Sequence, residues 1–360
     1  MKELLPAIQR WRGQGRDLAL ATVVRTVGSS PRQVGSRMVV SDSGEMAGSV
    51  SGGCVEGAVV EAALRILETR LPQLLHFGVS DEEAWAVGLS CGGAIHVLVE
   101  PMEREEGKDP VMGTLLEAVQ DSRILAVATE LPSGEGEEAR SPTPEPEGHS
   151  IHRLVLSPQG NVLGGLSDPD LKETVLTELR TVLDGKASGV REIGGRRLFL
   201  ERLEPEPRLV IIGAVHIAVV LARMAREVGF RVVIVDARDR FASPERFPEV
   251  DELILGWPQE ILPRLELDDQ SHVVVITHDE KLDNPALELA LSSPAPYVGA
   301  LGSRRTHARR LAALREAGVD EASLARIHAP IGLDIGARTP AEIALATLAE
   351  IVAVRNEAHK

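Results

Sequence analysis

From Leu209 onward the chain alternates short apolar runs with helical segments. Near-continuous apolar strands separated by helices are typical of a parallel sheet that is covered on both faces. The pattern therefore predicts a doubly wound parallel sheet in this part of the chain. Its five expected strands are Leu209–Ala214, Arg231–Ala237, Glu252–Gly256, His272–His278 and Pro296–Gly302.

The residues before this region carry an internal repeat. A shift of 116 positions aligns Ser36–Ser51 with His152–Ser167 and gives six identities in sixteen positions without a gap. Each copy begins with a strand candidate and continues through a loop into an apolar strand. It then turns at Gly44 or Gly160 and passes through a short strand into a helix. A further strand follows a Gly-Gly pair in each copy, so we expect an N-terminal α/β domain with internal duplication.

A segment rich in Pro and Glu, ERLEPEPR at Glu201–Arg208, separates the two patterns. This composition is typical of an exposed linker between domains. We place an N-terminal α/β domain at residues 1–203 and a C-terminal domain at residues 208–360.

Composition and charge exclude several classes of protein. The chain has 54 acidic and 39 basic residues, a net charge of -15 that repels nucleic acid and anionic membranes. Aromatic residues make up only 2%, too few for a base-stacking platform. No apolar run approaches the roughly 18 to 20 residues that span a bilayer, and the first residues lack the apolar core of a signal peptide. We expect a cytoplasmic protein.

The repeat provides a comparison for the two cysteines. Cys54 and Cys91 are too few for a disulfide framework, and a reducing cytoplasm keeps them as thiols. The second copy carries Asp170 and Ile193 at the corresponding positions. Since residues that the fold requires should recur in both copies, the thiols are candidates for chemistry.

Both thiols stand in glycine-rich turns. Cys54 follows Gly52 and Gly53 just before an expected helix, whose N-terminus favours the thiolate, a better nucleophile and soft-metal ligand. Glycines after Cys91 allow a bulky group to approach the backbone. A lone cysteine is more often a small buried apolar residue. A reversible Cys54–Cys91 redox switch is a further alternative.

The turn after the first expected strand of the C-terminal region resembles a dinucleotide-binding fingerprint, so this region is Rossmann-like. Gly213 begins the turn, His216 stands at the expected helix start, and Asp236 ends the next strand. These residues favour an NAD(P)-dependent oxidoreductase as an alternative function. Val215 argues against it, because it puts a β-branched side chain where glycine lets the pyrophosphate approach.

Two further groups lie after expected strands, on the edge where open α/β sheets bind ligands. Ser303, Arg304 and Arg305 supply an N-cap and two guanidinium groups at a helix start, which suits a phosphate. His278 and Asp279 follow the fourth strand. The alternatives are a solvated helix face for the arginines and a helix-capping turn for His278 and Asp279.

Several segments together carry a resemblance to a known family. They are GSSPRQVGSRMVV, GSVSGGCVEGAVVEAA, GLSCGGAIHVLVEP, GAVHIA, ITHDEKLDNPAL, YVGALGSRRTHARRL and PIGLDIGARTPAEIALATLAEIVA. The chain resembles the xanthine dehydrogenase accessory factor family, XdhC/CoxI. The resemblance implies a chaperone that binds molybdenum cofactor, protects it while a cysteine desulfurase supplies the sulfido ligand, and delivers it to a xanthine dehydrogenase-type enzyme. Val215 departs from the family turn, which usually has glycine.

The expected function is therefore that of a carrier and not of an enzyme. No nucleophile elbow, HExxH or Walker A loop is present. We expect the molybdopterin cofactor, in its mono- or dinucleotide form, between the glycine and cysteine loops and the carboxyl edge of the C-terminal sheet, with Cys54 as a ligand for molybdenum. A homodimer is expected through the apolar segment Leu345–Val354. The expected cofactor-binding residues are Arg32, Gly52, Gly53, Cys54, Cys91, Gly213, His216, Asp236, His278, Asp279, Ser303, Arg304 and Arg305.

Overall fold

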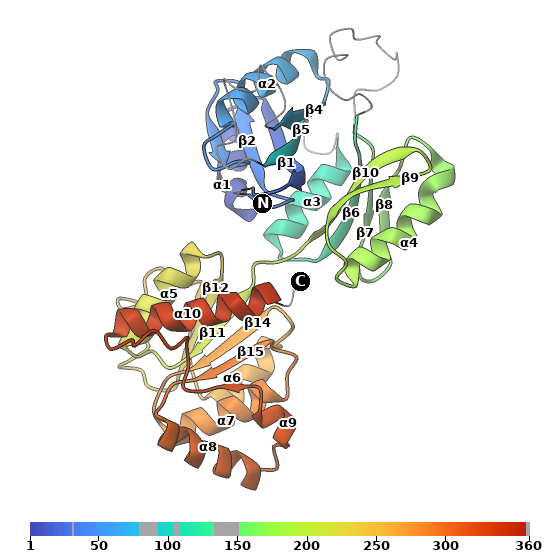
Figure 1. Cartoon of the computed structure of the whole chain (residues 1–360). Coiled ribbons are helices and arrows are strands. Elements are labelled where there is room, and N and C mark those ends of the chain that lie inside the picture. The colour runs from blue at the N-terminus through green and yellow to red at the C-terminus, as the bar shows by residue number, and fades with distance from the viewer. Residues whose placement is uncertain (31, 79–92, 104–108, 133–150, 358–360) are drawn as a thin grey trace. The chain divides into compact units, whose positions relative to one another are not determined.

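The computed structural model of the chain describes residues 1–30, 32–78, 93–103, 109–132 and 151–357. It divides into two compact units, unit 1 (Met1–Pro205) and unit 2 (Glu206–Lys360). In Figure 1 the colour runs from blue to green along unit 1 and from yellow to red along unit 2. None of the helices in the described part of the chain is long and apolar enough to cross a membrane.

The first half of unit 1 is an antiparallel sheet in the order β3-β2-β1-β5-β4. Helix α2 packs its apolar side on one face of the sheet, and α1 packs on the other through Ile8 and Trp11. The elements are the short η1 (Lys2–Leu4), α1 (Leu5–Gly13), β1 (Leu18–Val27), β2 (Arg37–Ser41), β3 (Met46–Gly48), α2 (Glu56–Thr69), β4 (Gln73–Phe77) and β5 (Ala94–Met102).

The second half has the same topology, which confirms the duplication. Its antiparallel sheet has the order β8-β7-β6-β10-β9, and α4 covers it as α2 covers the first sheet. The same shift of 116 positions carries β2 onto β7, β3 onto β8 and β4 onto β9. We did not expect β4 and β9. The elements are α3 (Pro110–Gln120), β6 (Leu125–Glu130), β7 (Arg153–Leu156), β8 (Val162–Gly164), η4 (Pro169–Leu171), α4 (Lys172–Leu183), β9 (Gly189–Ile193) and β10 (Arg196–Leu203).

Two buried ion pairs join the halves of unit 1 in a reciprocal way. Arg37 on β2 donates through Nη2 to both carboxylate oxygens of Glu201 on β10, at 2.5 and 2.6 Å. Arg153, at the equivalent position on β7, donates to Glu100 on β5. Each half therefore supplies one arginine and one glutamate to the other, and all four residues are buried. Removing one partner would leave a buried charge unpaired, so these pairs fix how the halves pack.

Unit 2 confirms the predicted doubly wound fold. Its six parallel strands have the order β13-β12-β11-β14-β15-β16, which is the Rossmann order. All five expected strands are present, and β16 is an addition of two residues. The strands are β11 (Arg208–Ile212), β12 (Arg231–Asp236), β13 (Glu252–Leu255), β14 (Ser271–Val275), β15 (Tyr297–Ala300) and β16 (Ile327–His328).

Helices cover both faces of this sheet. Alternate residues of β11 point to opposite sides, so Leu209 and Ile211 join one core while Val210 and Ile212 join the other. Figure 1 shows α5 and α10 on one face and α6, α7 and α8 on the other. The helices are α5 (His216–Glu227), α6 (Pro258–Leu265), α7 (Glu280–Leu291), α8 (Arg304–Glu316), α9 (Glu321–Leu324) and α10 (Pro340–Glu357).

Candidate functional site

Two of the expected site regions share one edge of the first sheet. Val27 at the end of β1 lies opposite Ala94 at the start of β5, and β3 ends at Gly48. Since neighbouring antiparallel strands alternate in direction, the segments that follow β1 and β3 begin at the same edge. The first of these segments contains Arg32, and the second contains Cys54.

The segment Ser49–Val55, which we call the glycine loop, wraps around the carboxylate of Glu56. Four main-chain N–H groups and two hydroxyl groups donate to this one side chain, which is only 6% exposed. The donors are the N–H groups of Val50 (3.2 Å), Ser51 (2.9 Å), Gly52 (3.0 Å) and Gly53 (2.8 Å) and the hydroxyls of Ser49 (2.7 Å) and Ser51. Gly52 and Gly53 both have positive φ angles, 78° and 114°, which only glycine adopts readily.

This arrangement keeps Glu56 ionised. Burial acts to raise the pKa of the carboxyl, but the hydroxyls of Ser49 and Ser51 and the main-chain N–H groups outweigh it and lower the pKa to about 2. The carboxylate also lies in the first turn of α2, where the helix dipole favours a negative charge. The donors of the glycine loop are thus occupied by an anion of the chain itself.

The same network places Cys54. Its N–H and that of Val55 donate to the Ser51 hydroxyl at 3.0 and 2.9 Å, and that hydroxyl donates to Glu56. Cys54 is half-buried beside the core between α2 and the sheet, and its thiol forms no disulfide with any residue that the structure describes. Because α2 begins at Glu56, the cysteine lies two residues before the helix.

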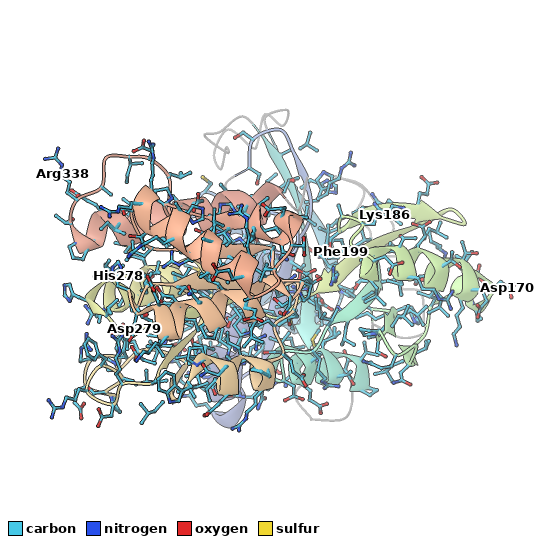
Figure 2. The ribbon with its side chains drawn as sticks, turned by 90° about the horizontal axis from the view of Figure 1, so that it is seen from below. Asp170, Lys186, Phe199, His278, Asp279 and Arg338 are labelled. Carbon is cyan, nitrogen blue, oxygen red and sulfur yellow. The ribbon has the colours of Figure 1, made fainter. Side chains whose placement is uncertain are left out.

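The second half carries different residues at this place. At the positions of Gly52, Gly53, Cys54 and Glu56 it has Asp168, Pro169, Asp170 and Lys172. Asp170 lies exposed beside the start of α4 (Figure 2). The fold therefore forms without the thiol and without the carboxylate at the helix start.

The other residues expected at this edge are placed less completely. Arg32 is exposed, and its carbonyl accepts a hydrogen bond from the Ser30 hydroxyl at 2.8 Å. Gly93 packs against the same loop, since a Cβ on it would stand 2.1 Å from the Ser29 carbonyl oxygen. Cys91 lies outside the described residues, and so does any pairing of it with Cys54.

In unit 2 the expected residues follow the carboxyl ends of the parallel strands. The strand order reverses between β11 and β14, which is the point where open α/β sheets bind ligands. Gly213 after β11 packs on Thr277 after β14, because a Cβ would stand 2.8 Å from Thr277 Cγ2. His216 is exposed at the first position of α5, and Val215 precedes it as N-cap.

Asp236, the residue expected to receive a ribose hydroxyl, is engaged by the chain. Its Oδ2 accepts the Ala214 N–H and Arg238 Nη2, each at 2.7 Å, and its Oδ1 accepts Arg238 Nε at 2.8 Å. Burial acts to raise the pKa of Asp236, but the hydrogen bonds from Arg238 and Ala214 outweigh it and lower the pKa. This carboxylate therefore already accepts one main-chain N–H of the turn at which a dinucleotide phosphate normally binds.

His278 and Asp279 stand together before α7, as Figure 2 shows. Asp279 caps the helix by accepting the Lys281 N–H at 3.0 Å. His278 is exposed and has a φ of 62°, a left-handed conformation that costs a non-glycine residue about 1 kcal/mol or more. Such strained residues cluster at binding sites.

The third group begins α8. The Ser303 hydroxyl accepts the Thr306 N–H at 3.2 Å, so Ser303 is the expected N-cap, and Arg304 and Arg305 are exposed. Arg310, further along the same helix, is buried and pairs with Asp283 at 2.8 Å. Neither Arg310 nor Glu56 was predicted from the sequence as a site residue.

In the part of the chain that the structure describes, no three His, Cys, Asp or Glu side chains gather as a metal site. Among the described residues, the candidate ligand for a metal centre is therefore the thiol of Cys54.

Comparison with known families matches both units. Residues 11–78 match the XdhC and CoxI family, and residues 209–351 match the XdhC Rossmann domain. The chain belongs to the XdhC and CoxI family. Within this XdhC protein, the first match contains Arg32, the glycine loop and Glu56, and the second contains the whole sheet edge of unit 2.

Relatives align along almost the whole XdhC chain. It is 29% identical to a probable xanthine dehydrogenase subunit of Bacillus subtilis, covering 94% of this chain and 93% of that one. It is 27% identical to the molybdenum cofactor insertion chaperone PaoD of Escherichia coli, covering 95% of this chain and 84% of that one. A crystal structure of a xanthine dehydrogenase from Bacillus halodurans has the same fold, with a TM-score of 0.76 at 22% identity over 98% of this chain and 96% of that one.

Proposed function

We propose that this protein is a molybdenum cofactor chaperone. The similarity to PaoD, named as an insertion chaperone for this cofactor, along 95% of the chain carries the proposal. In this role the protein binds the cofactor while a cysteine desulfurase supplies its sulfido ligand, and then passes it to a xanthine dehydrogenase-type enzyme. The mono- and dinucleotide forms of the cofactor are both candidates.

The glycine loop supports a role for Cys54 as the contact to the molybdenum centre. A thiolate is a soft ligand that suits a molybdenum and sulfur centre. Cys54 is half-buried, and its main chain is fixed through Ser51 and Glu56. The second half of the unit keeps the fold but has Asp170 at this place, so the thiol is not there to form the fold.

The dinucleotide alternative has less support. The Ala214 N–H, which opens the turn after β11, is already bonded to Asp236, and Val215 stands at the position where the fingerprint has glycine. A carrier role requires no catalytic group of the chain, because the reactive chemistry belongs to the cofactor. We propose a carrier and not an oxidoreductase.

The homodimer remains a prediction. Most apolar residues of the segment Leu345–Val354 pack within unit 2, and Leu348 and Ile351 are buried in the core beside α5. Leu345 is 51% exposed and is the part of the segment that remains for a partner.

The test is purification of the full chain from cells that make the cofactor, followed by molybdenum analysis and pterin fluorescence of the oxidised extract. We expect near-stoichiometric molybdenum and transfer of the cofactor to an apo-form of a xanthine dehydrogenase-type enzyme, measured as recovered activity. Protein from a cofactor-deficient strain is the control. Absence of molybdenum and pterin from protein made in the competent strain would contradict the proposal.

A further inference from the structure

Arg310 is a buried cation whose hydrogen bonding is incomplete. The residue is 5% exposed and lies on α8. Its Nη2 donates to Asp283 Oδ2 at 2.8 Å and to the Leu301 carbonyl at 3.3 Å. The other oxygen of Asp283 accepts the Thr277 hydroxyl at 2.6 Å. The pair thereby connects the segments that follow β14 and β15.

The second terminal nitrogen, Arg310 Nη1, is buried and has no hydrogen-bond partner among the residues that the structure describes. Leaving a buried donor unpaired destabilises the fold. This nitrogen faces Gly302, because a Cβ placed on Gly302 would stand 3.6 Å from it. Nη1 therefore lies against the turn Gly302–Arg305, which we call the α8 turn, with the Thr306 side chain packed beside it.

The α8 turn presents further donors. The first turn of an α-helix leaves its N–H groups without intrahelical acceptors and carries a partial positive charge. The Ser303 hydroxyl accepts the N–H of Thr306. The N–H groups of Arg304 and Arg305 belong to the first turn of the helix, where no intrahelical acceptor exists. The side chains of Arg304 and Arg305 are exposed beside them, in a chain whose net charge is -15.

At the usual phosphate position of this fold one main-chain donor is already paired. In the turn after β11 the Ala214 N–H donates to a carboxylate of the chain, Asp236, at 2.7 Å. At the α8 turn Asp283 takes one nitrogen of Arg310 and leaves the other free. The α8 turn therefore lies beside a buried donor that the described residues leave unpaired.

We infer that the α8 turn is a phosphate-binding site, with Arg310 Nη1 as its buried donor and Arg304 and Arg305 as its exposed ones. The ligand is a phosphate monoester or a pyrophosphate, whose oxygens accept hydrogen bonds from the guanidinium and main-chain N–H groups. The inference rests on the proposed function, in which this group is the phosphate end of the cofactor.

The test is calorimetric titration of the full chain with inorganic phosphate and, separately, with pyrophosphate at low ionic strength. Tighter binding of phosphate would indicate a monoester, and tighter binding of pyrophosphate a dinucleotide. The double variant Asp283→Asn, Arg310→Gln removes Nη1 while keeping an uncharged pair, because Arg310→Gln alone would leave Asp283 buried without its partner. We expect this variant to bind the better anion at least about tenfold more weakly.

The matched control is Arg309→Gln. Arg309 is the neighbouring residue on α8, is 66% exposed and pairs with Glu280 at 3.7 Å. Its loss should change anion affinity by less than about threefold, since exposed pairs contribute little. Equal losses in Arg309→Gln and in the double variant would overturn the inference, because general charge would then explain the binding.

A second variant covers the case in which the buried pair does not fold. Arg304→Ala, Arg305→Ala changes exposed residues only, so its melting temperature should barely change. It should also weaken anion binding at least about tenfold, and unchanged affinity would overturn the inference.

The inference and the proposed function fail in different ways. Wild-type protein that carries molybdenum cofactor but binds neither anion would overturn the α8 site and leave the chaperone function standing. Protein that binds anion through Arg310 but carries no cofactor would overturn the chaperone function and leave the α8 site standing.

Discussion

Replacing Glu56 by Gln should destabilise unit 1 by a margin that depends on pH. The pKa of the carboxyl falls from its ordinary value of 4.5 to about 2 in the fold. Each pKa unit corresponds to about 1.36 kcal/mol, so ionisation of this group stabilises the fold by about 3 kcal/mol at neutral pH. An amide at this place keeps one acceptor oxygen but turns its NH₂ group toward donors of the glycine loop.

The pH dependence follows from the direction of the shift. Because the folded pKa lies below the unfolded one, the stabilisation is present above about pH 4.5 and is lost as the pH falls toward 2. The difference between wild type and Glu56→Gln should therefore be constant from pH 7 to about 5.5. Below about pH 4.5 it should narrow by up to about 1.4 kcal/mol per pH unit.

Urea unfolding followed by tryptophan fluorescence measures this difference. In a Trp85→Phe, Trp257→Phe background the remaining tryptophan, Trp11, is buried in unit 1 and reports on it alone. The control is Glu130→Gln in the second half, since Glu130 accepts only the N–H and hydroxyl of Ser167, at 3.2 and 3.0 Å. The control should lose at most about 1 kcal/mol. A Glu56→Gln difference that stays constant down to pH 3.5 would refute the assigned role of ionisation.

Three further outcomes are expected. Cys54→Ser should lower the molybdenum content of the purified protein, measured by elemental analysis, more than Cys91→Ser does, because Cys54 adjoins the N-terminus of α2. Equal molybdenum occupancy in both variants and the wild type would contradict a thiol ligand. Arg37→Met should destabilise unit 1 by about 3 to 5 kcal/mol in urea unfolding, because it leaves the buried charge of Glu201 unpaired. Adding Glu201→Leu should restore most of the lost stability, and a double variant no more stable than the single one would argue against this reasoning. Wild type should bind NAD no better than about 1 mM by calorimetry, and Val215→Gly should bind it more tightly, whereas tight binding by the wild type would favour an oxidoreductase.

The apolar pattern predicted most of the fold because a buried strand appears in the sequence as an apolar run. β2 (RMVVS) and β11 (RLVII) are apolar runs between turn residues. β9 (GVREI) has only one fully buried residue, and β4 is half-buried throughout. Such edge strands form because a neighbour offers hydrogen bonds, and that neighbour is not visible in the local sequence. The repeat did carry the missing information, since β4 and β9 occupy equivalent positions.

Whether each site residue could be predicted also depends on how much of its environment is local in sequence. Ser303 was predicted as a cap residue, and a helix-capping turn was the stated alternative for Asp279, because capping is local in sequence. Arg310 was missed because it stands among exposed arginines on α8, and only its distant partner Asp283 marks it as buried. Glu56 had a usable signal, an acid that follows two glycines at a helix start. Its six donors come from the glycine loop before it, whose residues Gly52 and Gly53 were expected to bind the cofactor.

The reciprocal ion pairs of unit 1 bear on how this unit arose. In a two-fold symmetric dimer, a contact between residue i of one protomer and residue j of its partner is always repeated as j with i. A single ancestral half with one arginine and one glutamate would make both contacts of Arg37 with Glu201 and of Arg153 with Glu100 by pairing with its own copy. Fusion of two such genes would end the requirement that both halves be identical. The two halves would then be free to differ at Cys54 and Asp170, while the charges that hold them together would have to stay.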